Sequence, residues 1–420
     1  MKWSPQQDAA LVAVADWMSG SDQQVFRLDG YAGTGKTTLA QHFAEGIDGS
    51  VLYGAFTGKA AHVMQQKGCH GAATLHSMCY HTKEKGRAQL KELEQGLAEL
   101  RMELYGELSQ EDREDQEVVD KYVNNNRRVL EIQEMLQRER DEVAEPFFTL
   151  NVDSPIRYAK ILIIDEGSMV DGRLGEDVLS FGTKVLVLGD PAQLPPVAGA
   201  GFFTGEGTVP DFLLTDIHRQ AADNPIIAMA TQVRQQQALS LGSYGDSQVL
   251  SREQIDETYA QQADQMLVGR NKTRHSSNRR MRQLLGRTEL LPVNGDKLVC
   301  LRNNHDKGLL NGAIWHVDDV GHYDDDRIYL TLNPDVKGEQ LHVEAHTQHF
   351  LGRGDELPWW ERKEAEEFDF GYALTVHKAQ GSQWDNVLLF DESFCFRKDK
   401  WRWLYTGITR AAEKVTVVKM

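Results

Sequence analysis

Residues Gly30 to Thr37 have the types and spacing that suit phosphate binding. They read Gly-Tyr-Ala-Gly-Thr-Gly-Lys-Thr and match the phosphate-binding loop pattern G-x-x-x-x-G-K-[ST] at every fixed position. Residues 25–29 before the loop have the composition of a short strand, and residues 38–45 after it that of a helix. In this setting backbone N–H groups and the helix N-terminus attract phosphate oxygens. The pattern therefore predicts a nucleoside triphosphate site.

Two side chains of this loop have specific expected roles. Lys36 is placed to reach the β- and γ-phosphates, and the Thr37 hydroxyl to hold Mg²⁺. A plain glycine-rich turn is the alternative, but it does not explain why a strand precedes the loop and a helix follows it, as the phosphate-binding motif requires. The loop and helix residues expected to bind the nucleotide are Gly33, Thr34, Gly35, Lys36, Thr37 and Thr38.

Acidic and amide side chains follow two later strands. Asp165 and Glu166 come directly after the apolar run at residues 161–164. Asp165 is expected to hold Mg²⁺ partly through water, and Glu166 to act as the general base on the attacking water. Gln193 lies in the Gly-Asp-Pro-Ala-Gln segment that ends the next strand, where it is expected to contact the γ-phosphate. A proline-rich turn is the alternative for that segment.

Two arginines are candidates for stabilising the transition state of phosphoryl transfer. Arg219 follows Thr215-Asp-Ile-His218, and Arg410 lies in Tyr405-Thr-Gly-Ile-Thr-Arg410. Charge that develops on the transferred phosphoryl group requires fixed positive charge beyond a lysine and Mg²⁺. Because Arg410 lies far from the phosphate-binding loop in sequence, its action there requires two lobes to close around one nucleotide.

Composition limits the class of protein. The chain has 420 residues, which indicates more than one domain, and 40% hydrophobic and 26% charged residues, as in globular proteins. The N-terminal residues lack the apolar stretch of a secretory signal, and the four cysteines form no C-x-x-C pair, so we expect a cytoplasmic protein without disulfides or zinc. The net charge of −17 disfavours non-specific nucleic-acid binding, yet residues 270–287 carry seven basic residues and no acidic one.

The apolar pattern predicts an α/β fold. Short β-rich runs between helical segments indicate buried parallel strands, at whose ends open α/β sheets bind ligands. Residues 292–367 instead have alternating runs separated by turns, which predicts a small antiparallel β module. In residues 83–145 the apolar side chains recur every three or four positions, which predicts an antiparallel helical hairpin. Its apolar positions are Leu90, Leu93, Leu97, Leu100, Leu104, Val129, Ile132, Leu136 and Val143.

Taken together, these segments resemble a superfamily 1 DNA helicase of the RecD/Dda-like, 5′-to-3′ branch. Gln7 matches the adenine-reading Q motif, residues 30–37 motif I, and residues 165–169 motif II. The other motifs also occur in the family's order: residues 55–61 (Ia), 74–76 (Ib), 189–196 (III), Arg219 (IV), 372–382 (V) and 405–411 (VI). The chain departs from the family at Phe56, at Gly167 and in the hairpin, which occupies the place of the wedge domain.

The resemblance implies two RecA-like parallel-sheet lobes with ATP and Mg²⁺ between them. The implied domains are lobe 1 at residues 1–82 and 146–215, a helical-hairpin insertion at 83–145, lobe 2 at 216–291 and 368–420, and a β-barrel-like (SH3-like) module at 292–367. Gly381 of motif V is also expected to face the nucleotide.

Single-stranded DNA is the substrate that the resemblance implies. The residues expected to touch it by resemblance are Thr57, Lys59, Thr74, His76, Thr375 and His377. Asn271 and Arg279 belong to the basic segment, which is either a phosphate-binding surface or a solvated helix face. Two other segments also have two possible interpretations. Residues 394–403 mix aromatic and basic side chains, which either stack on bases or pack under motif VI. Trp359-Trp360 is either a wedge that faces the duplex or buried packing.

The expected activity is ATP-dependent unwinding of DNA by a monomer in replication, recombination or repair, in a bacterial or phage-infected cell. An RNA helicase or a protein-displacing translocase is the alternative. A P-loop kinase or nucleotide switch is disfavoured because it explains neither Arg410 nor residues 375–382. The hairpin is interpreted as a strand-separating arm, a docking surface for a replication or single-strand-binding protein, or an architectural element.

Overall fold

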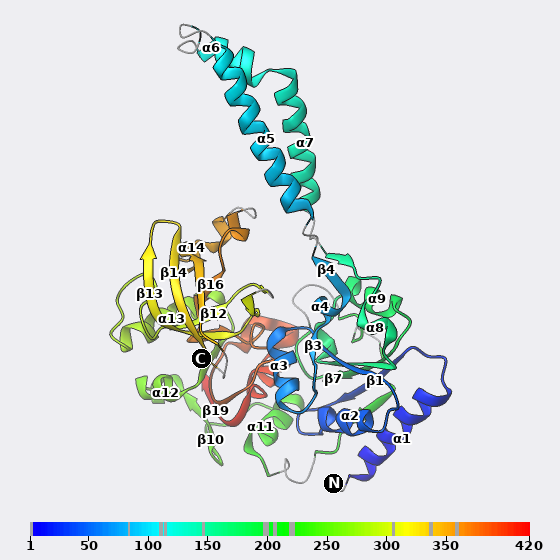
Figure 1. Cartoon of the computed structure of the whole chain (residues 1–420). Coiled ribbons are helices and arrows are strands. Elements are labelled where there is room, and N and C mark those ends of the chain that lie inside the picture. Colours follow the sequence, from blue (N-terminus) through cyan, green and yellow to red (C-terminus); the bar gives the residue numbers. More distant parts are fainter. Residues whose placement is uncertain are drawn as a thin grey trace. The chain divides into compact units, whose positions relative to one another are not determined.

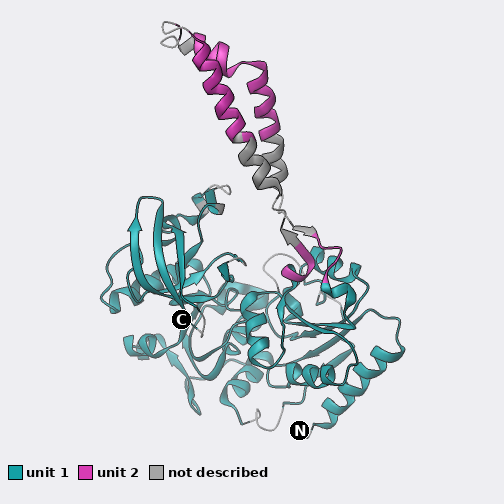
Figure 2. Cartoon of the chain, in the orientation of Figure 1, with its two compact units in different colours: residues 1–76, 155–420 teal, residues 77–154 magenta. Residues whose placement is uncertain are grey.

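The computed structural model describes residues 3–82, 85–108, 112, 116–144, 148–195, 201–204, 208–217, 223–304, 307–335, 339–357 and 361–420. The chain forms two compact units, residues 1–76 with 155–420, and residues 77–154 (Figure 2). The larger unit contains three sheets and the smaller one a helical pair. Among the described residues no helix is both long and apolar enough to cross a membrane.

The first sheet of the larger unit is built on the phosphate-binding loop. Its six strands lie in the order β3-β2-β6-β7-β1-β8, and every neighbouring pair is parallel (Figure 1). The strands are β1 (Val25–Gly30), β2 (Val51–Ala55), β3 (Ala73–Thr74), β6 (Ile161–Asp165), β7 (Lys184–Gly189) and β8 (Phe212–Leu214). The helices are α1 (Pro5–Gly20), α2 (Lys36–Glu45), α3 (Gly58–Gln66), α8 (Pro155–Tyr158) and α9 (Gly172–Ser180). Because β7 lies between β1 and β6, the ends of all three strands meet at one edge.

The second sheet forms lobe 2. Its strands lie in the order β17-β11-β18-β19-β10-β9, and only the β9–β10 pair is antiparallel. They are β9 (Gly242–Tyr244), β10 (Ser247–Ser251), β11 (Gln265–Val268), β17 (Ala373–Thr375), β18 (Trp384–Asp391) and β19 (Ala411–Lys419). The helices are α11 (Pro225–Arg234), α12 (Glu257–Gln262), α13 (Asn271–Leu284) and α15 (Lys400–Ile408), the last preceded by a 3-10 segment, η7 (Ser393–Asp399).

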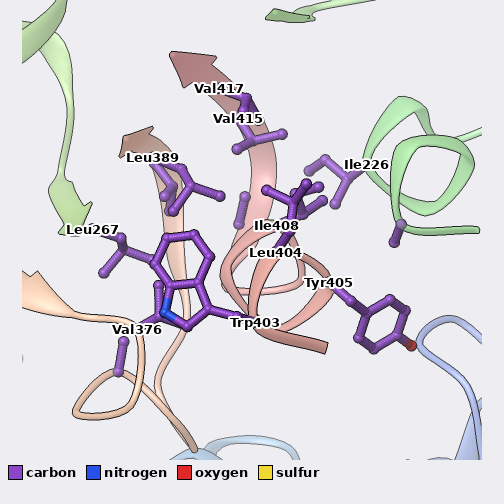
Figure 3. Close-up of a cluster of buried hydrophobic side chains, with 14 of the residues drawn as sticks. Ile226, Leu267, Val376, Leu389, Trp403, Leu404, Tyr405, Ile408, Val415 and Val417 are labelled. Carbon is purple, nitrogen blue, oxygen red and sulfur yellow. The ribbon is translucent and has the colours of Figure 1, made fainter. Parts of the chain in front are cut away.

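The core of lobe 2 packs α15 against the strands. Figure 3 shows the Trp403 ring beside Leu267, Val376 and Leu389, and Trp403 is fully buried. The parallel-sheet fold predicted from the apolar runs is confirmed for both lobes. The sequence shows these strands plainly because strands covered on both faces consist of nearly continuous apolar residues.

The third sheet is antiparallel and interrupts lobe 2. Its strands lie in the order β15-β14-β13-β12-β16, with bounds β12 (Lys297–Cys300), β13 (Ile314–Tyr323), β14 (Arg327–Pro334), β15 (Leu341–His346) and β16 (Phe368–Phe370). A short helix, α14 (Thr347–Phe350), follows β15. Backbone bonds from His346 to Glu366 and from Glu366 to Glu344 join the free edge of β15 to the segment that enters β16. These bonds bring the two ends of the strand order together, as closure into a small barrel requires.

The smaller unit contains two long helices that pack on each other. They are α5 (Lys85–Glu107) and α7 (Arg127–Ala144), with α6 (Gln116–Val119) and a π-helical turn (Asp120–Asn124) between them. Leu100, Leu104, Leu108, Val123 and Val129 form the buried seam. Strands β4 (Tyr80–Thr82) and β5 (Phe148–Leu150) pair antiparallel, and α4 (Leu75–Cys79) leads into β4.

Candidate active site

The loop between β1 and α2 has the backbone form of a phosphate cradle. Gly33 and Gly35 have φ values of 82° and 80°, a left-handed region that side chains disfavour. At Gly30 a Cβ would lie 2.7 Å from Oγ1 of Thr34 and 2.8 Å from Cβ of Leu214. The glycines are therefore required by the turn and by close packing, and α2 begins at the loop's end, where its N-terminal N–H groups attract anions.

Lys36 and Thr37 are the first two residues of α2. The Lys36 ammonium donates hydrogen bonds to the carbonyl oxygens of Gly30 and Tyr31. Oγ1 of Thr37 lies 3.2 Å from Oδ2 of Asp165 on β6. A hydroxyl and a carboxylate side by side are hard oxygen donors of the kind that Mg²⁺ takes together with phosphates. These two residues fit the predicted Mg²⁺ site.

Asp165 and Glu166 share a crowded position at the end of β6. Burial raises the pKa of Asp165, the neighbouring Glu166 carboxylate raises it further, and Lys36 lowers it. Glu166 has a φ of 54°, a left-handed conformation that is uncommon for a residue with a side chain. Backbone strain of this kind persists where the surrounding structure fixes it, and it is concentrated at functional sites.

Gly167, one of the departures from the family pattern, is explained by packing. A Cβ at this position would lie 2.3 Å from Cγ1 of Val187 on β7. A larger residue here would collide with the Val187 side chain, and the glycine removes no catalytic group.

Gln193 and Arg410 converge on Glu166 from opposite lobes. Oε1 of Glu166 lies 3.4 Å from Nε2 of Gln193 and 4.0 Å from Nη1 of Arg410. Arg410 is 5% exposed, and its guanidinium donates to the carbonyl oxygens of Thr406 and Ser382. A cavity of about 160 Å³ is lined by Asp165 and Glu166 of lobe 1 and by Gly381 and Arg410 of lobe 2. Residues separated by more than two hundred positions thus line one space.

Gln7 is tied to the phosphate-binding loop. Its Oε1 accepts from the Ser4 N–H at 3.0 Å, and its Nε2 donates to the Thr34 carbonyl at 3.0 Å. The amide oxygen therefore caps α1, and the amide nitrogen ties α1 to the loop. The reading of adenine by Gln7 stays a prediction. Thr38, on the first turn of α2, is exposed.

Two protein-family models match segments of this chain. A family model described as "AAA domain" matches residues 2–253, and one described as "UvrD-like helicase C-terminal domain" matches residues 370–418. The chain belongs to the AAA domain family. The first match covers lobe 1, the hairpin and the start of lobe 2, and the second covers the C-terminal part of lobe 2.

Two curated relatives cover parts of this chain. The ATP-dependent RecD2 DNA helicase of Deinococcus radiodurans is 30% identical over 283 residues, which are 60% of this chain and 35% of the relative. The conjugal transfer protein TraA of Rhizobium radiobacter is 24% identical over 262 residues, 54% of this chain and 22% of the relative. The chain thus spans about a third and about a fifth of the lengths of these two proteins.

Solved structures resemble the chain over nearly its whole length. Bacteroides Pif1 bound to ssDNA has a TM-score of 0.52 at 16% identity, covering 99% of this chain and 92% of that one. Pif1 helicase from Candida albicans has a TM-score of 0.51 at 17% identity, covering 100% and 94%. The resemblance to RecD-like superfamily 1 helicases is confirmed by the RecD2 relative and the helicase family model, and these structures confirm the two-lobed fold that it implies.

The residues of lobe 1 expected to touch DNA follow β2 and β3. Oγ1 of Thr57 accepts from the Ala60 N–H and caps α3. The Lys59 ammonium lies 4.2 Å from the ring centroid of Trp384 in lobe 2, and burial lowers its pKa to about 8. Thr74 is buried, and the His76 ring meets Phe56 edge-on. Contact of these residues with a nucleic acid stays a prediction.

In lobe 2, Thr375 and His377 flank the end of β17. Oγ1 of Thr375 accepts from the Lys378 N–H, and the His377 ring lies 5.2 Å from that of Phe396. Burial lowers the pKa of His377. Phe396 in turn stacks on Trp403 at 5.3 Å with an interplanar angle of 10°. Within the aromatic segment at residues 394–403, the rings of Phe396 and Trp403 therefore pack inside lobe 2 beside motif VI, whereas Phe394 is 61% exposed.

The basic segment forms α13, and most of its arginines are already paired. Arg270 binds the buried Glu392, Arg274 lies 3.0 Å from Asp369, and Arg280 pairs with Glu257. Arg282 and Arg287 both bind the buried Asp296. Asn271, Lys272 and Arg279 are exposed. The surface left for phosphate contact is thus much smaller than the count of basic residues indicates.

Two sets of predicted residues, Arg219 and Trp359-Trp360, lie outside the described part of the chain. Three residues of lobe 2 that contact the site were not predicted for that role. They are Tyr405, Thr406 and Gln380, and each forms a hydrogen bond with a segment of lobe 1. The signal for Tyr405 was a hydroxyl within the apolar run Trp403-Leu404-Tyr405.

Proposed function

We propose that the protein is an ATP-dependent DNA helicase that moves along single-stranded DNA from 5′ to 3′ and unwinds duplex. One observation carries this proposal: Asp165 and Glu166 line the same cavity as Gly381 and Arg410 from the other lobe. A site completed from a second lobe makes hydrolysis depend on lobe closure. A kinase or nucleotide switch contained within lobe 1 has no need of Arg410.

In this proposal the side chains have the roles that their motifs imply. Lys36 binds the β- and γ-phosphates, while Thr37 and Asp165 hold Mg²⁺, which supplies neutralising charge to those phosphates when bound. Glu166 accepts a proton from the attacking water. Gln193, Arg219 and Arg410 contact the γ-phosphate and stabilise the charge that develops on it.

DNA is held, in this proposal, by groups that grip phosphates without reading sequence. They are Thr57, Lys59, Thr74, His76, Asn271, Arg279, Thr375 and His377. The relatives support this assignment, because one is a DNA helicase by name and a structural neighbour is bound to ssDNA. Closure of the lobes on ATP then shifts one grip relative to the other. The protein acts as a monomer in the cytoplasm of a bacterial or phage-infected cell, in replication, recombination or repair.

The helical hairpin has the place of the wedge domain. We assign it to strand separation or to docking of a replication or single-strand-binding protein. Replacing residues 88–142 by a short linker distinguishes these roles. DNA-stimulated ATP turnover without unwinding supports a strand-separating arm, whereas full unwinding excludes one and leaves docking or architecture.

The proposed function is tested by ATP turnover and by unwinding. Single-stranded DNA is expected to raise turnover, and forked DNA with a 5′ tail to be unwound faster than DNA with a 3′ tail; Lys36→Ala is the inactive control. Stronger stimulation by RNA, or stimulation without unwinding, favours the RNA helicase or protein-displacing translocase. A folded protein that no nucleic acid stimulates contradicts the helicase assignment.

A further inference from the structure

Tyr405 is a buried polar side chain that joins the two lobes. It is 2% exposed and projects from α15 of lobe 2. Figure 3 shows its ring leaving the core, with the hydroxyl turned toward the blue ribbon of the N-terminal lobe. That hydroxyl accepts from the Ala32 N–H at 2.9 Å and donates to Oδ2 of Asp190 at 2.8 Å. We call this pair of bonds the Tyr405 bridge.

Both partners of the Tyr405 bridge belong to the nucleotide site. Ala32 is part of the phosphate-binding loop, so its bond fixes the peptide plane between Tyr31 and Ala32. Asp190 is 4% exposed, and its other oxygen accepts from the Ala192 N–H. Burial raises the pKa of Tyr405 well above its usual range, so the hydroxyl keeps its proton and remains a donor. A hydrogen bond to a buried carboxylate is stronger than one between neutral groups.

The segment that begins at Asp190 is held by lobe 2 at its other end as well. The Leu194 N–H donates to Oγ1 of Thr406 at 2.9 Å, and the Leu194 carbonyl accepts from Nε2 of Gln380 at 3.0 Å. The Leu194 side chain packs in the core of lobe 2. Gln193 stands directly before it and contacts Glu166. The position of lobe 2 therefore sets the position of Gln193.

A second contact reinforces the link to the phosphate-binding loop. The Arg234 guanidinium at the end of α11 lies 3.7 Å from the ring centroid of Tyr31. The loop thus meets lobe 2 on both sides of the Tyr31–Ala32 peptide.

Helix α15, which carries Tyr405, is linked by packed rings to His377, a proposed DNA contact. His377 lies against Phe396, and Phe396 stacks on Trp403, two residues before Tyr405. A shift of His377 is passed to α15 through closely packed rings, because packed cores do not deform continuously.

We propose that Tyr405 is a positioning residue through which lobe 2 sets the conformation of the phosphate-binding loop and of Gln193, so that single-stranded DNA on lobe 2 accelerates ATP hydrolysis. The regulatory part rests on the proposed function, since it needs DNA as the ligand. Tyr405 does not touch the reacting atoms in this scheme; it acts through Ala32, Asp190 and the segment up to Leu194.

Tyr405→Phe removes the hydroxyl and keeps the ring. Its matched control is Tyr244→Phe in the same lobe, because the Tyr244 hydroxyl bonds the backbone of Ser240 and, within the described part of the chain, no residue of lobe 1. Three quantities are measured in both: ATP turnover with and without an oligothymidine, affinity for that oligothymidine, and affinity for a fluorescent ADP with and without aluminium fluoride. Aluminium fluoride mimics the transferred phosphoryl group and reports the closed site without turnover.

We expect Tyr405→Phe to lower DNA-stimulated turnover and affinity for ADP with aluminium fluoride by about tenfold each, the loss for one hydrogen bond to a charged group. Affinity for ADP alone and for the oligothymidine is expected to change by less than about twofold, and Tyr244→Phe to match the wild type. Adding Asp190→Asn to Tyr405→Phe is expected to cost little more than the larger single change, because the two groups act as a unit.

The outcomes separate this inference from the proposed function. Equal stimulation and equal nucleotide affinities in Tyr405→Phe and wild type overturn the Tyr405 bridge and leave the helicase assignment standing. If DNA does not stimulate the wild type but Tyr405→Phe still loses affinity for ADP with aluminium fluoride, the helicase assignment fails and the bridge stands. If Tyr405→Phe does not fold, Thr406→Val loosens the other end of the segment, and wild-type behaviour there overturns the proposal.

Discussion

The cleft between the lobes and helix α13 are both rich in charged side chains, but the charges are arranged differently in the two places. On α13 the buried charges are matched: Arg282 binds Asp296, and Arg274 binds Asp369. In the cleft two carboxylates are neighbours instead: burial and the Glu166 carboxylate raise the pKa of Asp165, and Glu166 has a left-handed backbone. Like charges held together and a strained backbone are costly, so they persist where a ligand or a reaction uses them. The contrast marks the cleft as the site and α13 as largely structural.

The largest effect is expected in the cleft. Glu166→Gln removes the general base while it keeps the shape and hydrogen bonding of the side chain. We expect turnover to fall by about 10³-fold, with nucleotide affinity retained, because a positioned base contributes about 10² to 10⁴. Steady-state turnover and fluorescent nucleotide binding check this. Retained turnover would falsify the role of Glu166 and remove the main distinction between the cleft and α13.

On α13 the expected effect is on stability. Arg282→Ala leaves the fully buried carboxylate of Asp296 with Arg287 as its one remaining cationic partner among the described residues. Breaking a buried pair of this kind costs about 3 to 5 kcal/mol. The matched control is Arg280→Ala, whose pair with Glu257 is exposed and contributes about 0 to 1 kcal/mol. Thermal unfolding measures both; equal melting temperatures for the two variants contradict the structural role of Arg282.

Lys59 differs from both the cleft and α13, because it is a largely buried cation that lies over the Trp384 ring. Burial lowers its pKa to about 8 in the folded protein, against about 10.4 in an unfolded chain. Between these values the unfolded chain binds more protons, so the free energy of unfolding rises with pH there. Lys59→Met is expected to reduce that rise. Urea unfolding at a series of pH values gives the free energy of unfolding of the wild type and of Lys59→Met. If this free energy depends on pH in the same way in both proteins, Lys59 does not have the lowered pKa.

The sequence was sufficient for the fold, and it predicted the strand ends at which the candidate nucleotide site lies, for a physical reason. Buried parallel strands appear as apolar runs, and the loop at Gly30–Thr37 needs its glycines and lysine at fixed spacing. Since each strand end is followed by its functional residue, Asp165 and Gln193 were placed by the same pattern. Arg410 was predicted because its motif occurs in order, and the structure lines the cavity with it.

What the sequence did not reveal depends on contacts between distant residues. The basic count of α13 indicated a phosphate-binding surface, but the carboxylates that pair with Arg270, Arg274 and Arg282 lie elsewhere in the chain. Tyr405 and Asp190 were in recognised motifs, yet their bond spans 215 positions and has no local signature. Packing likewise explains Gly167 only through Val187 on the next strand.

Arg410→Ala tests whether the nucleotide site is completed from lobe 2. The measurement is ATP turnover with saturating single-stranded DNA, together with affinity for a fluorescent ADP to show that the loop on lobe 1 is intact. We predict a loss of turnover of about 10³-fold or more with ADP affinity nearly unchanged, as for an arginine that stabilises the transition state. Wild-type turnover in a folded Arg410→Ala protein would contradict this completion from lobe 2 and return the site to lobe 1 alone.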